Sequence, residues 1–194
     1  MTYIYKDVIL FINNMNFNII VAVDTNNGIG LNNTIPWYEP EDLKHFAKLT
    51  KGNGKNAVIM GKNTWNSLPQ RWLHNRFNII ISRNLDISGT NFQSFKDPKK
   101  AIEYCIKKEY ETVWIMGGGE IYNYFINNNL VDNIYISKLD KCYNCDVFFP
   151  EIPDTMTLNS RENLTNTIKL EVYSSNNGSL MNNPLLINDG LFIK

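Results

Sequence analysis

Two strand ends in this sequence carry groups that suit phosphate binding. An apolar strand pattern at 56–60 runs directly into Gly-Lys-Asn-Thr at 61–64, which opens a short predicted helix at 62–68. Free N–H groups and the dipole at a helix N-terminus attract phosphate, and the lysine and threonine add a cation and a hydroxyl. Ser82 and Arg83 close the next predicted strand in the same manner. The pattern therefore predicts a nucleotide-binding crevice at the carboxyl edge of a sheet.

A run of three glycines, Gly117 to Gly119, joins a predicted strand at 112–116 to a predicted helix at 120–126. Residues without side chains let the backbone approach a ligand closely. The run does not match the G-x-G-x-x-G fingerprint, and no other segment has that fingerprint between a strand and a helix. The sequence therefore argues against a standard Rossmann dinucleotide site.

One carboxylate, Asp42, falls inside an amphipathic helix predicted at 40–51. It lies four residues before Phe46, so the two side chains share one face of the helix. A carboxylate beside a core-facing aromatic ring is costly to bury unless it finds a partner. Two interpretations stay open at this point. Asp42 is either a solvated acid in the first helical turn, favoured by the helix dipole, or a group that faces a cleft and binds a polar heterocycle.

A glycine-containing loop follows the first predicted strand, at 18–23, and ends at Trp37. Gly28 and Gly30 would let this loop change conformation, as a lid over a ligand must. The alternative is an ordinary long turn after a strand.

Predicted strands and helices alternate over the first 140 residues, which favours an α/β fold with a central, mostly parallel sheet and helices on both faces. Asp97 and Pro98 open a further helix as N-cap and first helical residue. Two strand patterns at 155–159 and 168–174 have no helix between them, so they predict an antiparallel C-terminal edge. The remaining predicted strands are at 77–82 and 131–139.

The composition limits the classes of function. The chain has 194 residues, with 19 basic and 19 acidic side chains, so it suits one domain and lacks the basic balance of a nucleic-acid-binding protein. No apolar run approaches the roughly 20 residues that span a bilayer, and a sparse, odd set of three cysteines is not a disulfide framework. We therefore expect a cytoplasmic protein. Cys142 and Cys145 form a CxxC pair without a second ligand pair nearby, so we expect exposed loop thiols and no metal site.

Six segments, in this order and spacing, resemble the dihydrofolate reductase family over about residues 20–150. They read IVAV…GIG…IPW, PEDLKHF, VIMGKNTWNSLP, RWLHNRFNIIISR, IMGGGEIY and IYISKLD…CDVFFP. The resemblance implies the single-domain fold of that family. It also implies transfer of a hydride from NADPH to C6 of 7,8-dihydrofolate, giving tetrahydrofolate for one-carbon metabolism and thymidylate synthesis.

The resemblance implies that Asp42 is the acidic group of the pterin pocket, where it binds the 2-amino group and the N3 side of the ring. Ser137 stands where the family usually has threonine and keeps the hydroxyl beside Asp42, while Trp37 is implied to position a water molecule. Arg76 corresponds to the arginine that pairs with the α-carboxylate of the glutamate tail. The other substrate-binding positions that the resemblance implies are Ala22, Ile35, Leu43, Phe46, Leu68, Leu73 and Met116.

The resemblance also implies which residues bind NADPH. Lys62 and Arg83 would select the 2′-phosphate, the Gly117–Gly118 peptide would be cis, and Asp146 matches an acid that tethers the lid loop in some members. The implied cofactor-binding positions are Ala22, Ile29, Gly30, Gly61, Lys62, Asn63, Thr64, Ser82, Arg83, Gly117, Gly118, Gly119, Glu120, Ile121 and Tyr122.

Some positions depart from the family pattern. Trp72 and Asn75 replace a proline and a glycine in the loop before Arg76, and Glu120 is an acid where some members have arginine. We expect an N-terminal extension at 1–16, the reductase domain at 17–174 and a C-terminal tail of unknown role at 175–194. The expected partners are dihydrofolate and antifolate-type small molecules, with the protein acting as a monomer.

Two other functions stay open. The reductase domain of riboflavin synthesis shares the fold, although the combination of Asp42, Phe46, Trp37 and Arg76 serves a pterin with a glutamate tail and argues against it. The second alternative is a ligand-binding protein that descends from a reductase and no longer catalyses the reaction. The altered loop at 72–75 and the unmatched C-terminal tail favour this alternative, whereas the retention of Asp42, Trp37, Gly117 and Gly118 argues against it.

Overall fold

The computed structural model describes residues 15–51, 55–70 and 72–176. Gly52 and Gly54, which the sequence suggests as the end of the first helix, and Arg71 lie outside these ranges. So do residues 1–14 and 177–194, and the roles of the predicted extension and tail stay predictions.

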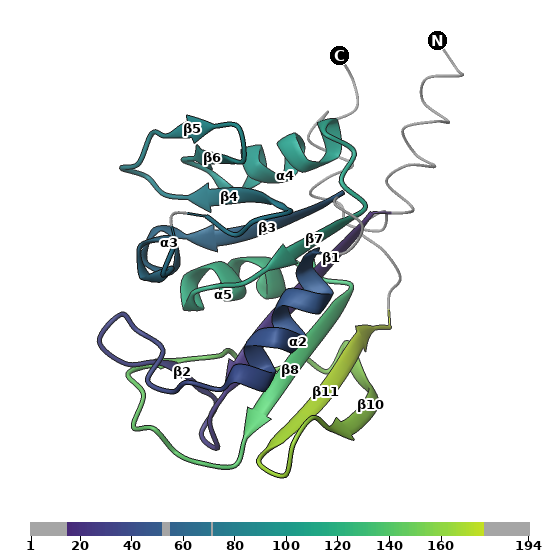
Figure 1. Cartoon of the computed structure of the whole chain (residues 1–194). Coiled ribbons are helices and arrows are strands. Elements are labelled where there is room, and N and C mark those ends of the chain that lie inside the picture. The colour runs from purple at the N-terminus through teal and green to yellow at the C-terminus, as the bar shows by residue number, and fades with distance from the viewer. Residues whose placement is uncertain (1–14, 52–54, 71, 177–194) are drawn as a thin grey trace.

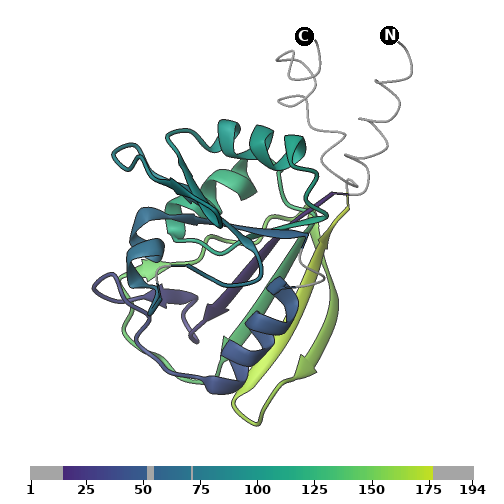
Figure 2. The ribbon, with the colours of Figure 1, turned by 45° about the horizontal axis from the view of Figure 1, so that its top comes forward.

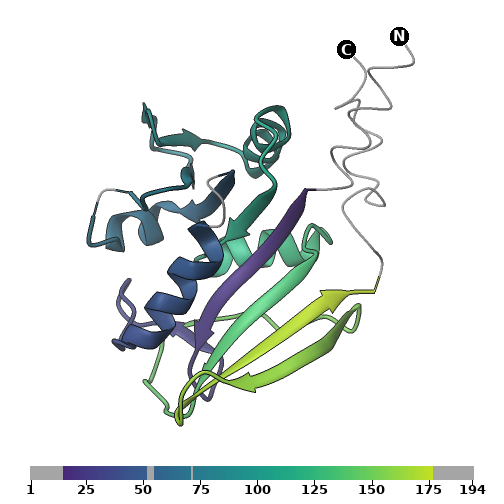
Figure 3. The same cartoon turned by 45° about the vertical axis from the view of Figure 1, so that its right-hand side comes forward.

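A central sheet runs through the described part of the chain in the order β10-β11-β8-β1-β7-β3-β4-β6-β5. The pairs from β8 to β6 are parallel, whereas β10, β11 and β5 join antiparallel. Figure 3 shows β10 and β11 beside β8 at one edge. The predicted mixed sheet with an antiparallel C-terminal edge is therefore confirmed. The strands are β1 (Asn16–Val23), β3 (Asn56–Gly61), β4 (Phe77–Ile81), β5 (Ser88–Gly89), β6 (Phe92–Phe95), β7 (Thr112–Ile115), β8 (Asn133–Leu139), β10 (Met156–Asn163) and β11 (Ile168–Ser175).

Helices cover both faces of the sheet (Figures 1 and 2). A smaller buried cluster around Trp114 packs against Phe46 and Leu49 of α2 and Trp65 of α3. A larger cluster on the other face includes Ile102 and its neighbours in α4 together with apolar side chains of α5. The described helices are α2 (Pro40–Lys51), α3 (Lys62–Ser67), α4 (Pro98–Lys107) and α5 (Gly119–Asn127).

Local sequence signals account for these elements. The central strands are nearly continuous β-branched runs because both of their faces are buried. Asp97 caps α4, since its Oδ1 accepts a hydrogen bond from the backbone N–H of Lys99 at 2.9 Å and Pro98 opens the helix as expected.

Several boundaries differ from those that the sequence suggests. The strand β1 begins at Asn16, and the side chain of Met15 is buried in the core, so the folded part reaches into the predicted extension. At the other end Ser175 still belongs to β11. The predicted strand at 131–139 begins only at Asn133. Single-sequence patterns locate an element well and its ends poorly.

A second, two-stranded sheet joins the lid loop, which we define as residues 24–37, to the segment after β8. It consists of β2 (Gly28–Gly30) and β9 (Val147–Phe148), paired antiparallel. The sequence predicts neither strand nor the short strands β5 and β6, because two to four residues are too few to show an alternation.

Candidate active site

A cleft of about 1440 Å³ opens along the carboxyl edge of the sheet. It is bordered by the ends of β1, β3 and β4, by α2 and α3, by the N-terminus of α5, and by the lid loop. Pockets for a single drug-sized ligand usually measure about 300–1,000 Å³. The cleft therefore has room for two ligands side by side.

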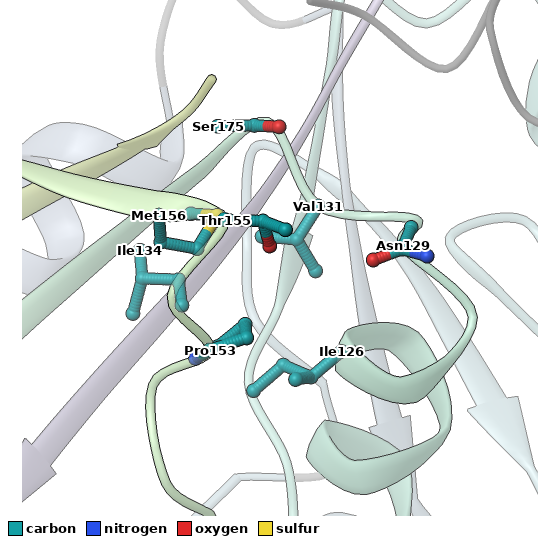
Figure 4. Close-up of a pocket in the computed structure, with 8 residues that line it drawn as sticks. All are labelled: Ile126, Asn129, Val131, Ile134, Pro153, Thr155, Met156 and Ser175. Atoms are coloured by element: carbon teal, nitrogen blue, oxygen red, sulfur yellow. The ribbon is translucent and has the colours of Figure 1, made fainter. Parts of the chain in front are cut away.

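A second cavity, between α5 and β10, measures only about 20 Å³. Figure 4 shows the residues that line this cavity: Ile126 and Pro153 lie below it in this view, Met156 lies to the left and Ser175 lies above. About 10–15 Å³ is enough for one water molecule. This cavity can hold water and no organic ligand, so we take the large cleft as the candidate site.

Asp42 lines the cleft from the first turn of α2. Burial raises the pKa of its carboxyl group above the ordinary value, while a hydrogen bond from Ser137 and the positive charge of His45 oppose this rise. Of the two interpretations of Asp42, the structure supports the one in which the acid faces a cleft.

Ser137 reaches Asp42 from the neighbouring strand β8, where it is buried and pairs with Ala22 of β1. The hydroxyl that the sequence places beside the acid is therefore in position, although the chain has lost the methyl group of a threonine. Around this pair, the half-buried side chains of Phe46 and Met116 give the cleft apolar walls.

The lid loop closes one side of the cleft and is held in place by several contacts. Asp24 is buried, and its carboxylate accepts backbone hydrogen bonds from Asn26, Gly28 and Tyr143 at 2.7–3.0 Å. Burial alone would raise the pKa of Asp24, but these bonds and one from Cys145 outweigh it and lower the pKa. The loop is therefore anchored by an ionised carboxylate at its base.

Further along the loop, Asp146 Oδ2 accepts a hydrogen bond from the backbone N–H of Asn32 at 2.9 Å. This contact agrees with the tethering role that the resemblance implies for Asp146. Trp37, at the end of the loop, packs its ring against Tyr143 with 5.1 Å between the centroids. At the tip, the amide of Asn63 in α3 donates to Asn33 Oδ1 at 3.0 Å, so the loop touches the opposite wall of the cleft.

Arg76 lies at the far end of the cleft and is buried. Its Nη1 donates to the hydroxyl of Thr50, its Nε donates to His74 O at 3.0 Å, and its guanidinium lies over the ring of Phe46 at 5.7 Å. Burial lowers the pKa of Arg76, and no carboxylate of the described residues forms an ion pair with it. A buried cation with free donors suits a ligand carboxylate.

Of the two departures in the loop before Arg76, Asn75 is accommodated, whereas the buried indole Nε1 of Trp72 has no hydrogen-bond partner among the described residues. Asn75 adopts φ of 60°, a left-handed conformation that glycine takes easily and asparagine tolerates better than other residues. Trp72 packs on His74 and on Phe92, each with 5.8 Å between ring centroids. The asparagine therefore reproduces the backbone that the family's glycine would allow.

The two glycine junctions meet at the opposite end of the cleft. The backbone N–H of Gly61 donates to Gly117 O at 2.7 Å, and the Gly117–Gly118 peptide is cis, as the resemblance implies. Gly117 has φ of +95°, and a Cβ there would lie 2.7 Å from the ring of Tyr122. The Tyr122 hydroxyl donates to Ile20 O at 3.0 Å.

The helices α3 and α5 both begin at this end, with Gly61 and Gly118 as their N-caps and no side-chain cap at either. Their first N–H groups are thus available to the cleft, where Lys62 and Thr64 add a cation and a hydroxyl. Arg83 and Ser82 line the cleft at the end of β4. These groups fit the phosphates of a dinucleotide cofactor. Glu120, in the first turn of α5, is the one acid among them and does not help to bind a phosphate.

The structure brings the predicted site residues together. All of them line the cleft except Gly117, which is buried behind it against Tyr122. Sequence reasoning missed other polar residues of the lining, among them Lys51, Gln70, Asn84 and Lys96. The lining also includes Tyr38, Glu39, Ala47, Ser67, Pro69, Trp72, His74, Pro98, Tyr124 and Val147. In one sequence without relatives, a polar residue outside a motif gives no indication that it lines a cleft.

The CxxC pair lies at the base of the lid loop. Cys142 is exposed as expected, and its sulfur accepts a hydrogen bond from Asn26 Nδ2 at 3.3 Å. The expectation is wrong for Cys145, which is half-buried because its side chain packs against Gly28, where a Cβ would lie 2.5 Å away. Among the described residues, no three side chains of His, Cys, Asp or Glu converge as metal ligands. No helix of the described chain is long and apolar enough to cross a membrane.

Comparisons with known proteins agree on one family. The family model described as dihydrofolate reductase matches residues 16–175. The dihydrofolate reductase of Aedes albopictus is 35% identical over 156 residues, which cover 73% of this chain and 83% of that protein. The viral dihydrofolate reductase of Saimiriine herpesvirus 2 (strain 488) is 37% identical over 146 residues, which cover 70% of this chain and 68% of that protein.

A solved structure, dihydrofolate reductase from Enterococcus faecalis complexed with NADP(H) and RAB-propyl, is also similar. Its TM-score is 0.72 at 25% sequence identity, and the match covers 83% of this chain and 96% of that one. The fold and the cleft thus define an α/β reductase that depends on a nicotinamide dinucleotide. The chain belongs to the dihydrofolate reductase family. It catalyses the NADPH-dependent reduction of dihydrofolate to tetrahydrofolate, the reaction of a family that acts in one-carbon metabolism and is a target of antifolates.

Proposed function

We propose that Asp42, Ser137 and Trp37 act on the pterin ring in this reaction. Asp42 binds the 2-amino group and the N3 side of the ring, and its negative charge favours the protonated form of N5. Ser137 donates a hydrogen bond that keeps the buried Asp42 available as an anion. Trp37 holds a water molecule beside the ring. When bound, NADPH supplies the hydride from the nicotinamide C4 to C6 of the pterin.

We further propose that the apolar walls and Arg76 bind the rest of dihydrofolate. Leu43, Phe46, Leu68 and Leu73 pack against the pterin and the benzoyl ring, together with Ala22, Ile35 and Met116. Arg76 binds the α-carboxylate of the glutamate tail, because it is a buried cation that lines the cleft and forms no ion pair with a carboxylate of the described chain.

The cofactor is proposed to lie along the other half of the cleft. Lys62, Thr64, Ser82 and Arg83 bind the adenosine phosphates, and the 2′-phosphate is held by the two cations, which selects NADPH over NADH. The bare backbone from Gly117 to Gly119 and the start of α5 lie along the pyrophosphate. Other contacts come from Ile29, Gly30, Asn63, Ile121 and Tyr122, all of which line the cleft.

One observation carries these assignments: a single cleft is lined by a half-buried carboxylate with a raised pKa, by the phosphate-type groups of two strand ends and by a buried arginine. The test follows the loss of NADPH absorbance with dihydrofolate, with and without methotrexate. Consumption that methotrexate blocks supports the assignments. No consumption by a folded protein that binds NADPH would instead favour a binding protein that has lost catalysis.

Three finer properties belong to the same proposal. We propose that the cleft binds antifolates, as the Enterococcus faecalis enzyme binds RAB-propyl, and that the protein is a monomer in the cytoplasm. The free thiols of Cys105, Cys142 and Cys145 suit a reducing compartment. Light scattering measures the oligomeric state, and cell fractionation tests the location.

A further inference from the structure

Asn78 is a buried amide that the reaction described above does not use. It is the second residue of β4, is fully buried (0% exposed), and follows Arg76 by two positions. Its Oδ1 accepts a hydrogen bond from Leu73 N at 2.9 Å, and its Nδ2 donates to Leu73 O at 2.9 Å. One side chain thus pairs with both backbone polar groups of Leu73, as a neighbouring strand would.

The same amide reaches two more carbonyl groups. Its Nδ2 lies 3.1 Å from Arg76 O and 3.1 Å from Asn91 O, and Asn91 O also accepts the backbone N–H of Asn78 at 2.9 Å. Asn78 therefore joins both ends of the 73–76 loop to the segment that leads into β6.

The backbone of the loop has few other partners. Within the part of the chain that the structure describes, residues 72–75 form no backbone-to-backbone hydrogen bond; the other contacts include that of Arg76 Nε with His74 O and the packing of Trp72 on Phe92. Asn75 also holds a left-handed conformation at the turn. Because buried backbone groups need partners, the hydrogen bonds of the Asn78 amide favour this conformation of the loop.

This loop places Leu73, His74 and Arg76 in the lining of the cleft. The guanidinium of Arg76 is held between the hydroxyl of Thr50 and the ring of Phe46, both in α2. A bidentate contact with a carboxylate requires the guanidinium plane to be oriented correctly. A shift of the loop would therefore misalign Arg76 while leaving Asp42, at the other side of the ring pocket, in place.

We propose that Asn78 is a positioning residue for the glutamate tail of the substrate: it holds the 73–76 loop so that Arg76 faces the tail carboxylate. The proposal rests on the role proposed above for Arg76. It assigns to Asn78 no part in the chemistry at the pterin ring.

The test measures tail selectivity, defined as kcat/KM for dihydrofolate divided by kcat/KM for dihydropteroate, which lacks the glutamate. We expect Asn78→Ser to lower this ratio about tenfold, through a higher KM for dihydrofolate with kcat nearly unchanged. Arg76→Gln, measured beside it, should lower the ratio by at least as much. NADPH binding, followed by fluorescence, should stay unchanged in both variants.

Asn18→Ser is the matched control, because Asn18 is also a buried asparagine, but its side chain pairs with Asn133 and not with the 73–76 loop. If Asn78→Ser lowers kcat/KM equally for both substrates, as a general loss of stability would, Asn78 is structural only and the proposal is overturned. If Arg76→Gln itself leaves the ratio unchanged, the role of Arg76 is wrong and both proposals fall.

If Asn78→Ser does not fold, a second pair of variants tests whether the loop conformation sets the tail selectivity. Asn75 is exposed and has positive φ, so Asn75→Gly should keep the loop and the ratio. Asn75→Val disfavours that backbone without touching the buried amide, and we expect it to lower the ratio severalfold. Equal ratios for these two variants would contradict the proposal.

Discussion

At the scale of single residues, the site depends on where charge is placed in a half-buried cleft. The carboxylate of Asp42 is partly withdrawn from water, and its pKa is raised by that burial, although Ser137 and His45 act in the opposite direction. A carboxylate in such a position interacts strongly with a protonated ring because little water screens it. Arg76 is also withdrawn from water, so its positive charge should interact strongly with a ligand carboxylate that binds beside it.

Asp42→Asn should lower kcat/KM for dihydrofolate about 100-fold or more near neutral pH, since the charge that favours protonated N5 is lost. Activity of this variant should partly recover at low pH, where the substrate arrives already protonated. In the wild type, Asp42 becomes protonated as the pH falls through its raised pKa. The contribution of its negative charge to the rate is therefore lost at low pH. Rates measured across pH check this, with Glu41→Gln as the control because Glu41 is exposed and pairs with Lys44. Full activity of Asp42→Asn at neutral pH would remove Asp42 from the mechanism.

Gly117→Ala should destabilise the protein by about 3 kcal/mol, because a Cβ there would lie 2.7 Å from the ring of Tyr122 and φ is +95°. The control is Gly118→Ala, where the nearest atom to a Cβ, Thr64 Oγ1, lies at 3.7 Å, an ordinary contact. Urea denaturation gives both free energies of unfolding. Equal stability of the two variants would show that the ring of Tyr122 moves aside freely.

At the scale of elements, long-range pairs hold the parts that carry the site. The lid loop is anchored at Asp24 and tethered at Asp146, and both contacts join it to the segment after β8. The antiparallel edge of the sheet is held together by ion pairs between neighbouring strands. Buried Glu171 of β11 forms ion pairs with Lys138 of β8 at 2.8 Å and Arg161 of β10 at 2.6 Å, so one carboxylate connects three strands.

Glu171→Gln should lower the free energy of unfolding by about 1–3 kcal/mol at neutral pH. Burial alone would raise the pKa of Glu171, but hydrogen bonds from Lys138, Tyr173 and Arg161 outweigh it and lower the pKa. A lowered pKa means that the carboxylate stabilises the fold above its unfolded pKa and that this stability is lost as pH falls through the folded pKa.

The difference between wild type and Glu171→Gln should therefore shrink in acid, which urea denaturation at several pH values measures. Glu162→Gln, at an exposed position of β10, is the control and should change stability little at any pH. A difference that stays constant into acid would mean that packing, and not the charge of Glu171, stabilises this edge.

At the scale of the whole molecule, one cleft of about 1440 Å³ runs between the helices of one face, the lid loop and the ends of the parallel strands. Its lining comes from segments between Ile20 and Val147, so a ligand that fills it holds most of the chain together. Binding to the folded state alone raises stability by mass action.

NADPH at 100 times its Kd should raise the stability by about 2.7 kcal/mol, which corresponds to a rise in Tm of several degrees. NADH at the same concentration should raise Tm much less, because Lys62 and Arg83 find no 2′-phosphate. Thermal unfolding of the wild type and of Arg83→Gln, which should lose this discrimination, measures the effect. Equal shifts with both dinucleotides would contradict the proposed 2′-phosphate site.

The sequence by itself predicted the central strands, the four described helices and, through the family resemblance, part of the lining of the cleft. It could do so because buried β-branched runs, glycines at strand ends and a helical acid carry their signal within a few neighbouring positions. The cis peptide and the positions of Asp42 and Arg76 were likewise available through motifs that are contiguous in the chain.

Only the tertiary structure decided which side chains support those motifs. Thr50 bonds to Arg76, Asp24 to Tyr143 and the Asn78 amide to Asn91, and tertiary folding brings each of these partners close. In the same way β2 pairs with β9, which lies more than 110 residues further along the chain. An asparagine or a two-residue strand looks alike wherever it occurs in a sequence. The hydrogen-bonding capacity of these groups is local, but what they bond to depends on chain segments brought together by burial of the common core.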